Sequence, residues 1–251
     1  MIHRPIQMDA NIATKARMFN PFGPNMFYLS LHDRFVKELL GIVNKLDSKQ
    51  DIKDKLDSSG QVIHGTNAVE NQKNSIVDGQ MYPIHPEYVE DGDNNAIIDV
   101  ITNLTLLYAG IANEEVRSDV SLEDYPDAIE LLEVESKEFQ VKIEGIWYVK
   151  MKQGDFHILH EHSASGATLA GAIYLDMPDD IPWPQGNMNW IPPGGPQTMY
   201  NGTWQAHPKS GDVFIWPAWL LHTVYPFRSD KTRTMISFNS IILSPKKKKK
   251  K

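Results

Sequence analysis

The chain has 251 residues, of which 41% are hydrophobic. This suits one domain with a sizeable core, because all-β barrels and sandwiches reach ~200–250 residues as single domains. Cysteine is absent, which excludes disulfides, thiolate metal sites and thiol nucleophiles, so a metal would need His and carboxylate ligands. The formal net charge is -7, but six of the 25 basic residues form the run 246–251, and without them 19 basic residues stand against 32 acidic ones. A body this acidic repels phosphate backbones, which disfavours nucleic-acid partners.

The first part of the chain, residues 1–137, mixes helix patterns with polar loops. It is expected to form a helix and strand region that packs on the β core of the second part. Apolar residues at helical spacing, from Phe35 to Leu46, predict the first helix. The patterns predict, in order, a strand at 25–31, a helix at 33–46, loop at 60–95, a buried helix at 96–111 and an acidic loop at 112–127.

From residue 138 the pattern changes to short β segments. Residues 139, 141 and 143 are apolar and alternate with polar ones, as in a half-buried strand. Further strands are predicted at 147–151, 156–162, 168–177, 213–217, 222–227 and 232–243. This series favours a sandwich or jelly roll and places the β core at 138–245, within a mainly β protein with flanking helices (α+β).

One long break, residues 178–210, interrupts these strands and is rich in Pro, Gly, Asn and Trp. A structureless segment of this length is usually a lid, a binding loop or disordered. We interpret it as a lid, in which Trp183, Trp190 and Trp204 either line a substrate cleft or pin the loop to the barrel. The lysine run 246–251 is interpreted as a solvated, disordered tail.

His160 and His162 are the candidate metal ligands with which the functional argument begins. They lie two residues apart in a predicted strand, so both imidazoles are expected on one face and Glu161 on the other. His157, three residues before His160, is expected to face away from them. Two imidazoles joined by a distant third can cap one face of a metal and leave positions open, although imidazoles suit Fe, Zn, Cu or Ni. Alone, such a pair is more often two ordinary core or surface residues.

The surroundings of this pair resemble a known family. The matching segments are GDFHILHEH at 154–162, AGAIYL at 170–175, GDVFIWPAWLLH at 211–222 and RTMISFN at 233–239. Together they are similar to a family of 2-oxoglutarate/Fe(II) oxygenases found in marine bacteria and phages and related to the prolyl 4-hydroxylases. The resemblance covers residues 146 to 242 and implies a double-stranded β-helix, the cupin-like jelly roll, with iron at its mouth.

The resemblance also implies roles for particular residues. His160 and His222 fall on ligand positions, and His162 falls where the prolyl hydroxylases have Asp, a departure that leaves the site one negative charge short. Arg233 is implied to bind the distal carboxylate of 2-oxoglutarate, which the planar fork of an arginine suits. Tyr174 is implied to assist it, with an ordinary core tyrosine as the alternative. Ser237 and Asn239 are candidates for the rim of the same site.

The implied reaction uses Fe(II), 2-oxoglutarate and O2 to hydroxylate a small-molecule or peptidyl substrate, with formation of succinate and CO2. One alternative is a cupin-type metal enzyme that does not use 2-oxoglutarate, and another is a non-catalytic jelly-roll binding or structural protein. A zinc hydrolase is a third, but no supporting base stands out. No apolar run of ~20 residues predicts a membrane span, and the N-terminus lacks the apolar stretch of a secretory signal. We therefore expect a cytoplasmic location, in the producing cell or in an infected host cell.

Overall fold

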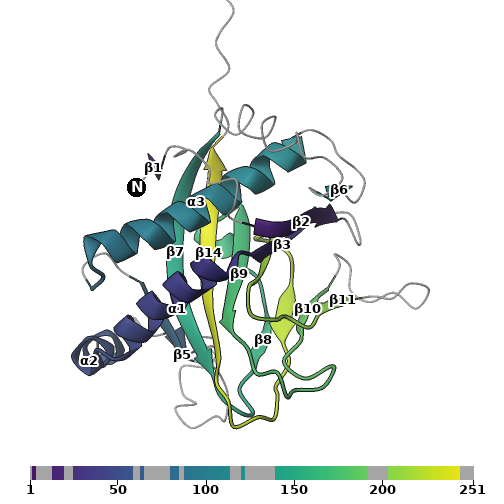
Figure 1. The fold of residues 1–251 in the computed structure, drawn as a ribbon. Coiled ribbons are helices and arrows are strands. Elements are labelled where there is room, and N and C mark those ends of the chain that lie inside the picture. The colour runs from purple at the N-terminus through teal and green to yellow at the C-terminus, as the bar shows by residue number, and fades with distance from the viewer. Residues whose placement is uncertain are drawn as a thin grey trace, which may run out of the picture.

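In the computed structural model, two β-sheets face each other and helices cover the outer face of the larger one (Figure 1). The structure describes residues 2–3, 13–19, 25–58, 63–64, 80–84, 88–113, 120–121, 139–191 and 203–243. The helices are α1 (Asp33–Asp47), α2 (Gln50–Ser58) and α3 (Asp91–Asn113). Within these ranges no helix combines the length and the apolar character needed to cross a membrane.

The larger sheet has the order β4-β5-β7-β14-β9-β12-β3-β2-β6, and β1 pairs with β7 beside this path. Its strands are β1 (Ile2–His3), β2 (Ala13–Phe19), β3 (Met26–Leu31), β4 (Ile63–His64), β5 (Gln80–Pro83), β6 (Val120–Ser121), β7 (Gln140–Met151), β9 (Leu169–Asp176), β12 (Asp212–Pro217) and β14 (Arg233–Leu243). The smaller sheet has the order β11-β10-β13-β8. Its strands are β8 (His157–His160), β10 (Met188–Trp190), β11 (Trp204–Ala206) and β13 (His222–Val224).

The path of the chain between the two sheets defines the fold. From β7 onward the chain passes from the larger sheet to the smaller one and back, in the order β7, β8, β9, β10 with β11, β12, β13 and β14. Neighbouring strands in this set are antiparallel. The central four strands of the larger sheet, β7-β14-β9-β12, lie opposite the four strands of the smaller sheet (Figure 1). This is a double-stranded β-helix, which confirms the predicted mainly β jelly-roll class.

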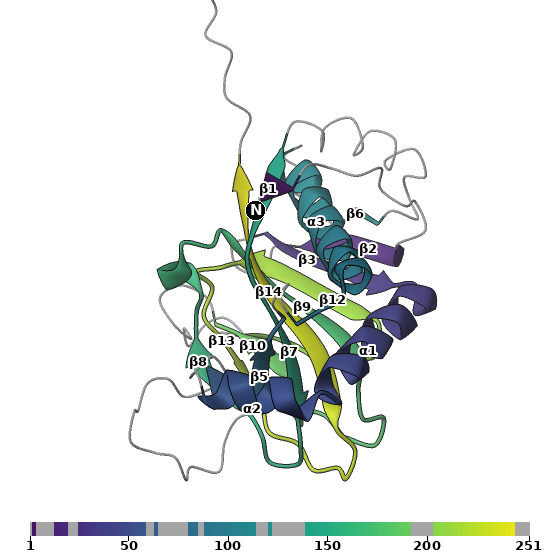
Figure 2. The same cartoon turned by 90° about the vertical axis from the view of Figure 1, so that its left-hand side faces the viewer.

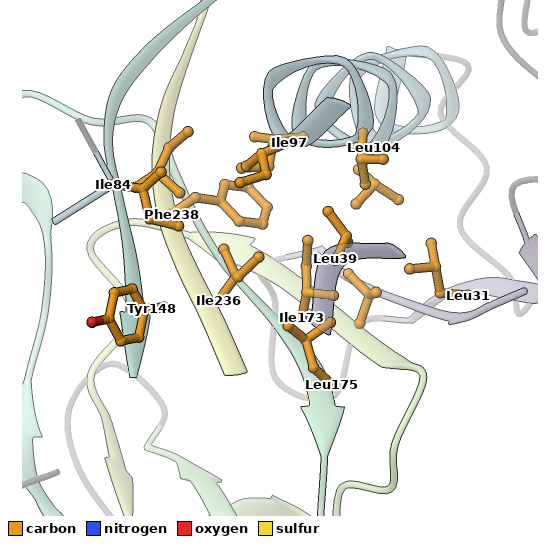
Figure 3. Packing of buried hydrophobic residues seen from close by; sticks show 14 of the residues in the cluster. Leu31, Leu39, Ile84, Ile97, Leu104, Tyr148, Ile173, Leu175, Ile236 and Phe238 are labelled. Atoms are coloured by element: carbon orange, nitrogen blue, oxygen red, sulfur yellow. The ribbon is translucent and has the colours of Figure 1, made fainter. Parts of the chain in front are cut away.

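The outer hydrophobic core lies between the larger sheet and the helices α1 and α3, which stand on the side away from the smaller sheet (Figure 2). Ile173, Ile236 and Phe238 reach from β9 and β14 toward Leu39 of α1 and Ile97 of α3 (Figure 3). The helix α1 buries one stripe at helical spacing, as its sequence predicts. This core therefore holds the outer face of the barrel strands rigid and leaves their inner face for the site.

A second core fills the barrel between the two sheets. It is made of buried apolar and aromatic side chains, most of them on the strands: Met26, Val149, Met151, Ala170, Ala172, Tyr174, Met177, Ile181, Met188, Trp190, Ala206, Phe214, Trp216, Leu220, Val224, Phe227 and Met235. Strand alternation explains the division, since on β14 Met235 faces inward and Ile236 outward.

Several predicted elements differ from the structure. The break 178–210 is not loop throughout, because it contributes β10 and β11 to the smaller sheet. The predicted strands 139–143 and 147–151 form one strand, β7. The predicted loop 60–95 contains β4, β5 and the start of α3. The lysine tail lies outside the described residues, and the division of the chain at residue 137 remains a prediction.

Gly171 of β9 is required by the close approach of β14. A Cβ atom built on Gly171 would overlap the ring of Phe238, its ladder partner, which is fully buried. We expect Gly171→Ala to lower the free energy of unfolding by about 1–3 kcal/mol, as overpacking does. Urea denaturation measures this. Gly41→Ala on α1 is the matched control: apart from the adjacent residues and backbone of its own helix, nothing lies within 4 Å of its added Cβ, so it should stabilise the helix by up to ~1 kcal/mol. Equal effects of both substitutions would contradict the packing explanation.

Candidate metal centre

Three histidines meet at one end of the barrel interior. His160 is the last residue of β8 and His222 the first of β13, and the two are direct ladder partners. His162 follows β8 and precedes a short 3-10 turn (Ser163–Ser165). Its backbone N–H donates to the carbonyl of Ala218 at 2.7 Å, which ties this segment to the turn before β13. The candidate ligand atoms of the three imidazoles all lie within 4.8 Å of one another.

Hydrogen bonds from the ring nitrogens orient two of these imidazoles. The Nδ1 of His160 lies 2.7 Å from the carbonyl oxygen of Ile158, and the Nδ1 of His222 lies 2.9 Å from that of Leu220. A carbonyl only accepts, so both Nδ1 atoms carry the proton and both Nε2 atoms keep a free lone pair. A hydrogen bond of this kind fixes the ring orientation of metal-binding histidines in other proteins.

His162 has different partners. Its Nε2 lies 3.2 Å from the Nε2 of His222, and its Nδ1 lies 3.4 Å from the amide Nδ2 of Asn239 on β14. Its ring stacks on that of His222 with centroids 5.0 Å apart. The Nε2 of His162 is thus the atom that faces the cluster.

Burial keeps these imidazoles neutral. Desolvation lowers the pKa of His222 well below its ordinary value and lowers that of His162 to about 4, and the pKa of His160 is also lowered by burial. Neutral imidazoles are the form that binds metal. The three nitrogen donors therefore fit a divalent cation such as iron, and the same set also suits zinc, copper or nickel. Glu161 is outside this cluster, since its carboxylate accepts a hydrogen bond from the backbone N–H of Ser163.

Arg233 is completely buried and is not the surface arginine that its neighbouring turn suggests. Its guanidinium donates to the carbonyl of Gly186 at 3.0 Å and lies 5.0 Å from the centre of the Tyr174 ring. Among the described residues, no carboxylate pairs with it. Within the described structure the cation therefore has no anion to neutralise it, which is costly unless a ligand supplies one.

Several buried polar atoms of this barrel core also lack partners within the described part of the chain. They include Arg233 Nε, the Tyr174 hydroxyl, and the indole nitrogens of Trp190 and Trp216. A series of ring contacts joins them to the histidines: Trp216 lies 4.9 Å from His222 and 5.4 Å from Trp190. Most of these atoms are donors, so the interior suits an anionic ligand. Burial raises the pKa of Tyr174, which keeps its hydroxyl protonated as a donor.

The structure places His157 inside the barrel, where strand alternation does not predict it. The pairing of β8 with β13 contains an irregularity, so His157 pairs with the inward-facing Val224 just as His160 pairs with His222. The His157 and His160 rings lie 6.0 Å apart, and the His157 Nε2 has no partner among the described residues. Sequence reasoning misses this residue because a bulge reverses the alternation on which the prediction depends.

The predicted rim residues Ser237 and Asn239 and the predicted lid tryptophans have different surroundings in the structure. Ser237 faces a backbone carbonyl, with its Oγ 3.5 Å from Gly171 O, whereas Asn239 contacts His162. Trp190 packs inside the barrel and does not lie in a lid, while Trp183 is 60% exposed. Trp219 is 48% exposed in the turn before β13.

The lowered pKa of the buried His157 predicts how the stability of the protein depends on pH. Burial lowers the pKa of His157 to about 3, whereas in the unfolded chain it is near 6.5. The unfolded state therefore binds more protons between these values, and stability present above pH 6.5 is lost as the pH falls toward 3. We expect urea midpoints of the metal-free protein to fall from pH 7 to pH 4. His157→Leu should flatten this dependence, and an unchanged slope would contradict the assignment.

Three solved structures are similar to this chain in fold. One is a 2OG-Fe(II) oxygenase family oxidoreductase from Burkholderia pseudomallei, at 19% identity and TM-score 0.34, covering 40% of this chain and 44% of that one, so this chain spans less than half of its length. A prolyl-4-hydroxylase from Pseudomonas putida has 13% identity and TM-score 0.46, covering 85% and 91%. The alpha-ketoglutarate-dependent carbocyclase SnoK from nogalamycin biosynthesis has 10% identity and TM-score 0.49, covering 88% and 81%.

In sequence, no curated protein matches this chain. One family model does match, over the barrel strands that carry the histidines and Arg233. Residues 145–239 match the family described as "Putative 2OG-Fe(II) oxygenase".

Proposed function

We propose that this protein is a 2-oxoglutarate- and Fe(II)-dependent dioxygenase that hydroxylates an organic substrate, with peptidyl side chains as the first class to assay. One observation carries the proposal: the buried guanidinium of Arg233, which pairs with no carboxylate of the described residues, shares the barrel interior with a cluster of three histidines. A metal alone would need only the histidines. The buried cation calls for an anionic ligand as well, and 2-oxoglutarate has carboxylates at both ends.

His160 and His222 would hold the iron through Nε2, since each directs its Nδ1–H to a backbone carbonyl. His162 would supply the third nitrogen in place of a carboxylate. Because all three ligands are neutral, the iron would keep its full charge, and the co-substrate would supply the compensating negative charge.

Arg233 would bind the distal carboxylate of 2-oxoglutarate, assisted by the hydroxyl of Tyr174. Both groups are fully buried and both have hydrogen-bonding atoms without partners in the described structure. A charge-assisted hydrogen bond to a carboxylate satisfies them. Trp190 and Trp216 pack in the same barrel core as Tyr174, and Trp216 contacts His222, so these apolar rings would exclude water around a bound ligand and strengthen its electrostatic contacts.

When bound, the iron and 2-oxoglutarate supply the oxidising chemistry: one oxygen atom of O2 enters succinate, formed with release of CO2, and the other enters a C–H bond of the substrate. The protein's own side chains would orient the metal ligands and bind the co-substrate. The tethered Nδ1 atoms hold the imidazole planes, and the guanidinium fixes the far end of the co-substrate.

The proposal is tested by adding 2-oxoglutarate to the Fe(II)-loaded protein without oxygen and recording the visible charge-transfer absorption, then admitting oxygen and measuring succinate. We expect an absorption band that requires both components, and succinate formation stimulated by a substrate from a panel of peptides and small molecules. Metal binding without any response to 2-oxoglutarate would instead favour a cupin-type metal enzyme. Failure to bind metal would favour a non-catalytic jelly-roll protein.

A further inference from the structure

Asn239 is a polar side chain of β14 that contacts the histidine cluster. It is 3% exposed and faces inward, and its amide Nδ2 lies 3.4 Å from the Nδ1 of His162. Its other amide atom, Oδ1, is buried and has no partner among the described residues. His162 is also the one histidine of the cluster whose Nδ1 does not face a backbone carbonyl, so its tautomer depends on Asn239 at Nδ1 and on His222 at Nε2.

Without a metal, the hydrogen bonds among Asn239, His162 and His222 are compatible with one another. If Asn239 donates to Nδ1, the proton of His162 must be on Nε2, the atom that lies 3.2 Å from the Nε2 of His222. The Nε2 of His222 is unprotonated, because its Nδ1–H donates to Leu220. His162 would then donate to His222, and this hydrogen bond would occupy two of the three candidate ligand atoms.

We infer that Asn239 is a positioning residue that switches His162 into its metal-binding tautomer. Rotation of the Asn239 amide by 180° exchanges its oxygen and nitrogen, which have nearly the same size and shape. Oδ1 then accepts a hydrogen bond from Nδ1–H of His162. The imidazole proton moves from Nε2 to Nδ1 by exchange with solvent, so the total number of protons is unchanged and the Nε2 atoms of His162 and His222 both become free.

An amide suits this position because it can donate in one state and accept in the other. Aspartate can only accept, so it would favour the metal-binding tautomer in both states. Leucine has a similar shape and can do neither. The inference rests on the metal site of the proposed function, but it does not depend on 2-oxoglutarate or on turnover.

The test measures Zn²⁺ affinity by calorimetric titration of the metal-free full chain at pH 8, with no co-substrate present. Relative to wild type, Asn239→Leu is expected to bind Zn²⁺ about 10–100-fold more weakly, as with other lost partners of metal-binding histidines. The loss is larger in the metal-bound state, because the Nδ1–H of a metal-bound imidazole is a stronger donor than the amide of Asn239. Asn239→Asp should bind Zn²⁺ at least as tightly as wild type. Ser240→Ala is the matched control: it is the next residue, and its Oγ lies 3.3 Å from Thr105 Oγ1 on the helix side. It should leave the affinity unchanged.

Long-range ¹H–¹⁵N NMR of the ring of His162 supplies a second readout. We expect protonated Nε2 in the metal-free protein and protonated Nδ1 in the Zn²⁺-loaded protein. Wild-type affinity in Asn239→Leu, or Nδ1 protonated in both states, would overturn the inference. If the Zn²⁺ affinities follow the expected order but the Fe(II)-loaded protein forms no succinate in the assay of the proposed function, the inference stands and the proposed dioxygenase is refuted.

Discussion

Replacing Arg233 with methionine is expected to abolish binding of 2-oxoglutarate and, at the same time, to stabilise the ligand-free protein. Arg233 is fully buried with no carboxylate partner in the described structure, so its charge costs stability when no ligand is bound. Methionine is comparably long and apolar, and replacing a buried charge by an apolar side chain gains about 1–3 kcal/mol. The same change removes the cation that would bind the distal carboxylate, and affinity for 2-oxoglutarate should fall at least ~100-fold.

Thermal and urea denaturation with Fe(II) under anaerobic conditions, with and without 2-oxoglutarate, measures both effects. At 100 times its dissociation constant, 2-oxoglutarate should stabilise the wild type by about 2.7 kcal/mol and Arg233→Met by almost nothing. Arg228→Met is the matched control, since Arg228 is exposed five residues earlier in the chain. Equal stabilisation of wild type and Arg233→Met by 2-oxoglutarate would remove Arg233 from the site.

The second large effect is on metal affinity, and it separates two buried histidines of the barrel, His222 and His157. His222→Gln should lower Fe(II) affinity by more than ~100-fold, because it removes an oriented ligand at the centre of the cluster. His157→Gln should leave metal affinity unchanged, since His157 does not belong to the group of three histidines whose ligand atoms converge. Both residues are buried and both belong to the smaller sheet, so general damage to the fold would affect them alike.

Metal content after dialysis against Fe(II) without oxygen, together with titration by Co²⁺, distinguishes the two variants. Retention of metal by His222→Gln would show that the cluster is not the binding site. Loss of metal from His157→Gln would show that the ligand set includes a fourth residue, His157.

The sequence predicts the larger strands because their residues alternate over many positions. On β14, Met235 and Ile236 take opposite faces, and each face meets its own core. The strands β10 and β11 escape prediction because they have three residues each, too few to show a period. They become strands through pairing with one another and with β13, which is information from distant parts of the chain.

Prediction of the site from the sequence is limited in the same way, because part of its geometry depends on pairing between distant strands. His160 and His162 are expected together because residues two apart on a strand share a face, and the structure does bring them together. The reason is different, however: β8 ends at His160, and His162 is held by its hydrogen bond to Ala218. Alternation assigns His157 to the wrong face, because one irregularity in the pairing of β8 with β13 has no signature in the residues themselves. Arg233 is predicted only through family motifs, since its local sequence resembles an exposed turn.

The strand β14 has a consequence for folding kinetics. It pairs with β7 and β9, each of them many residues earlier in the chain, and its inner face carries Arg233 near one end and Asn239 toward the other. Loop closure over such separations is slow. The barrel can therefore acquire neither its buried cation nor the partner of His162 until this one strand has inserted. Metal capture during refolding should lag behind the formation of helical structure, and a stopped-flow metal indicator would report the insertion of β14.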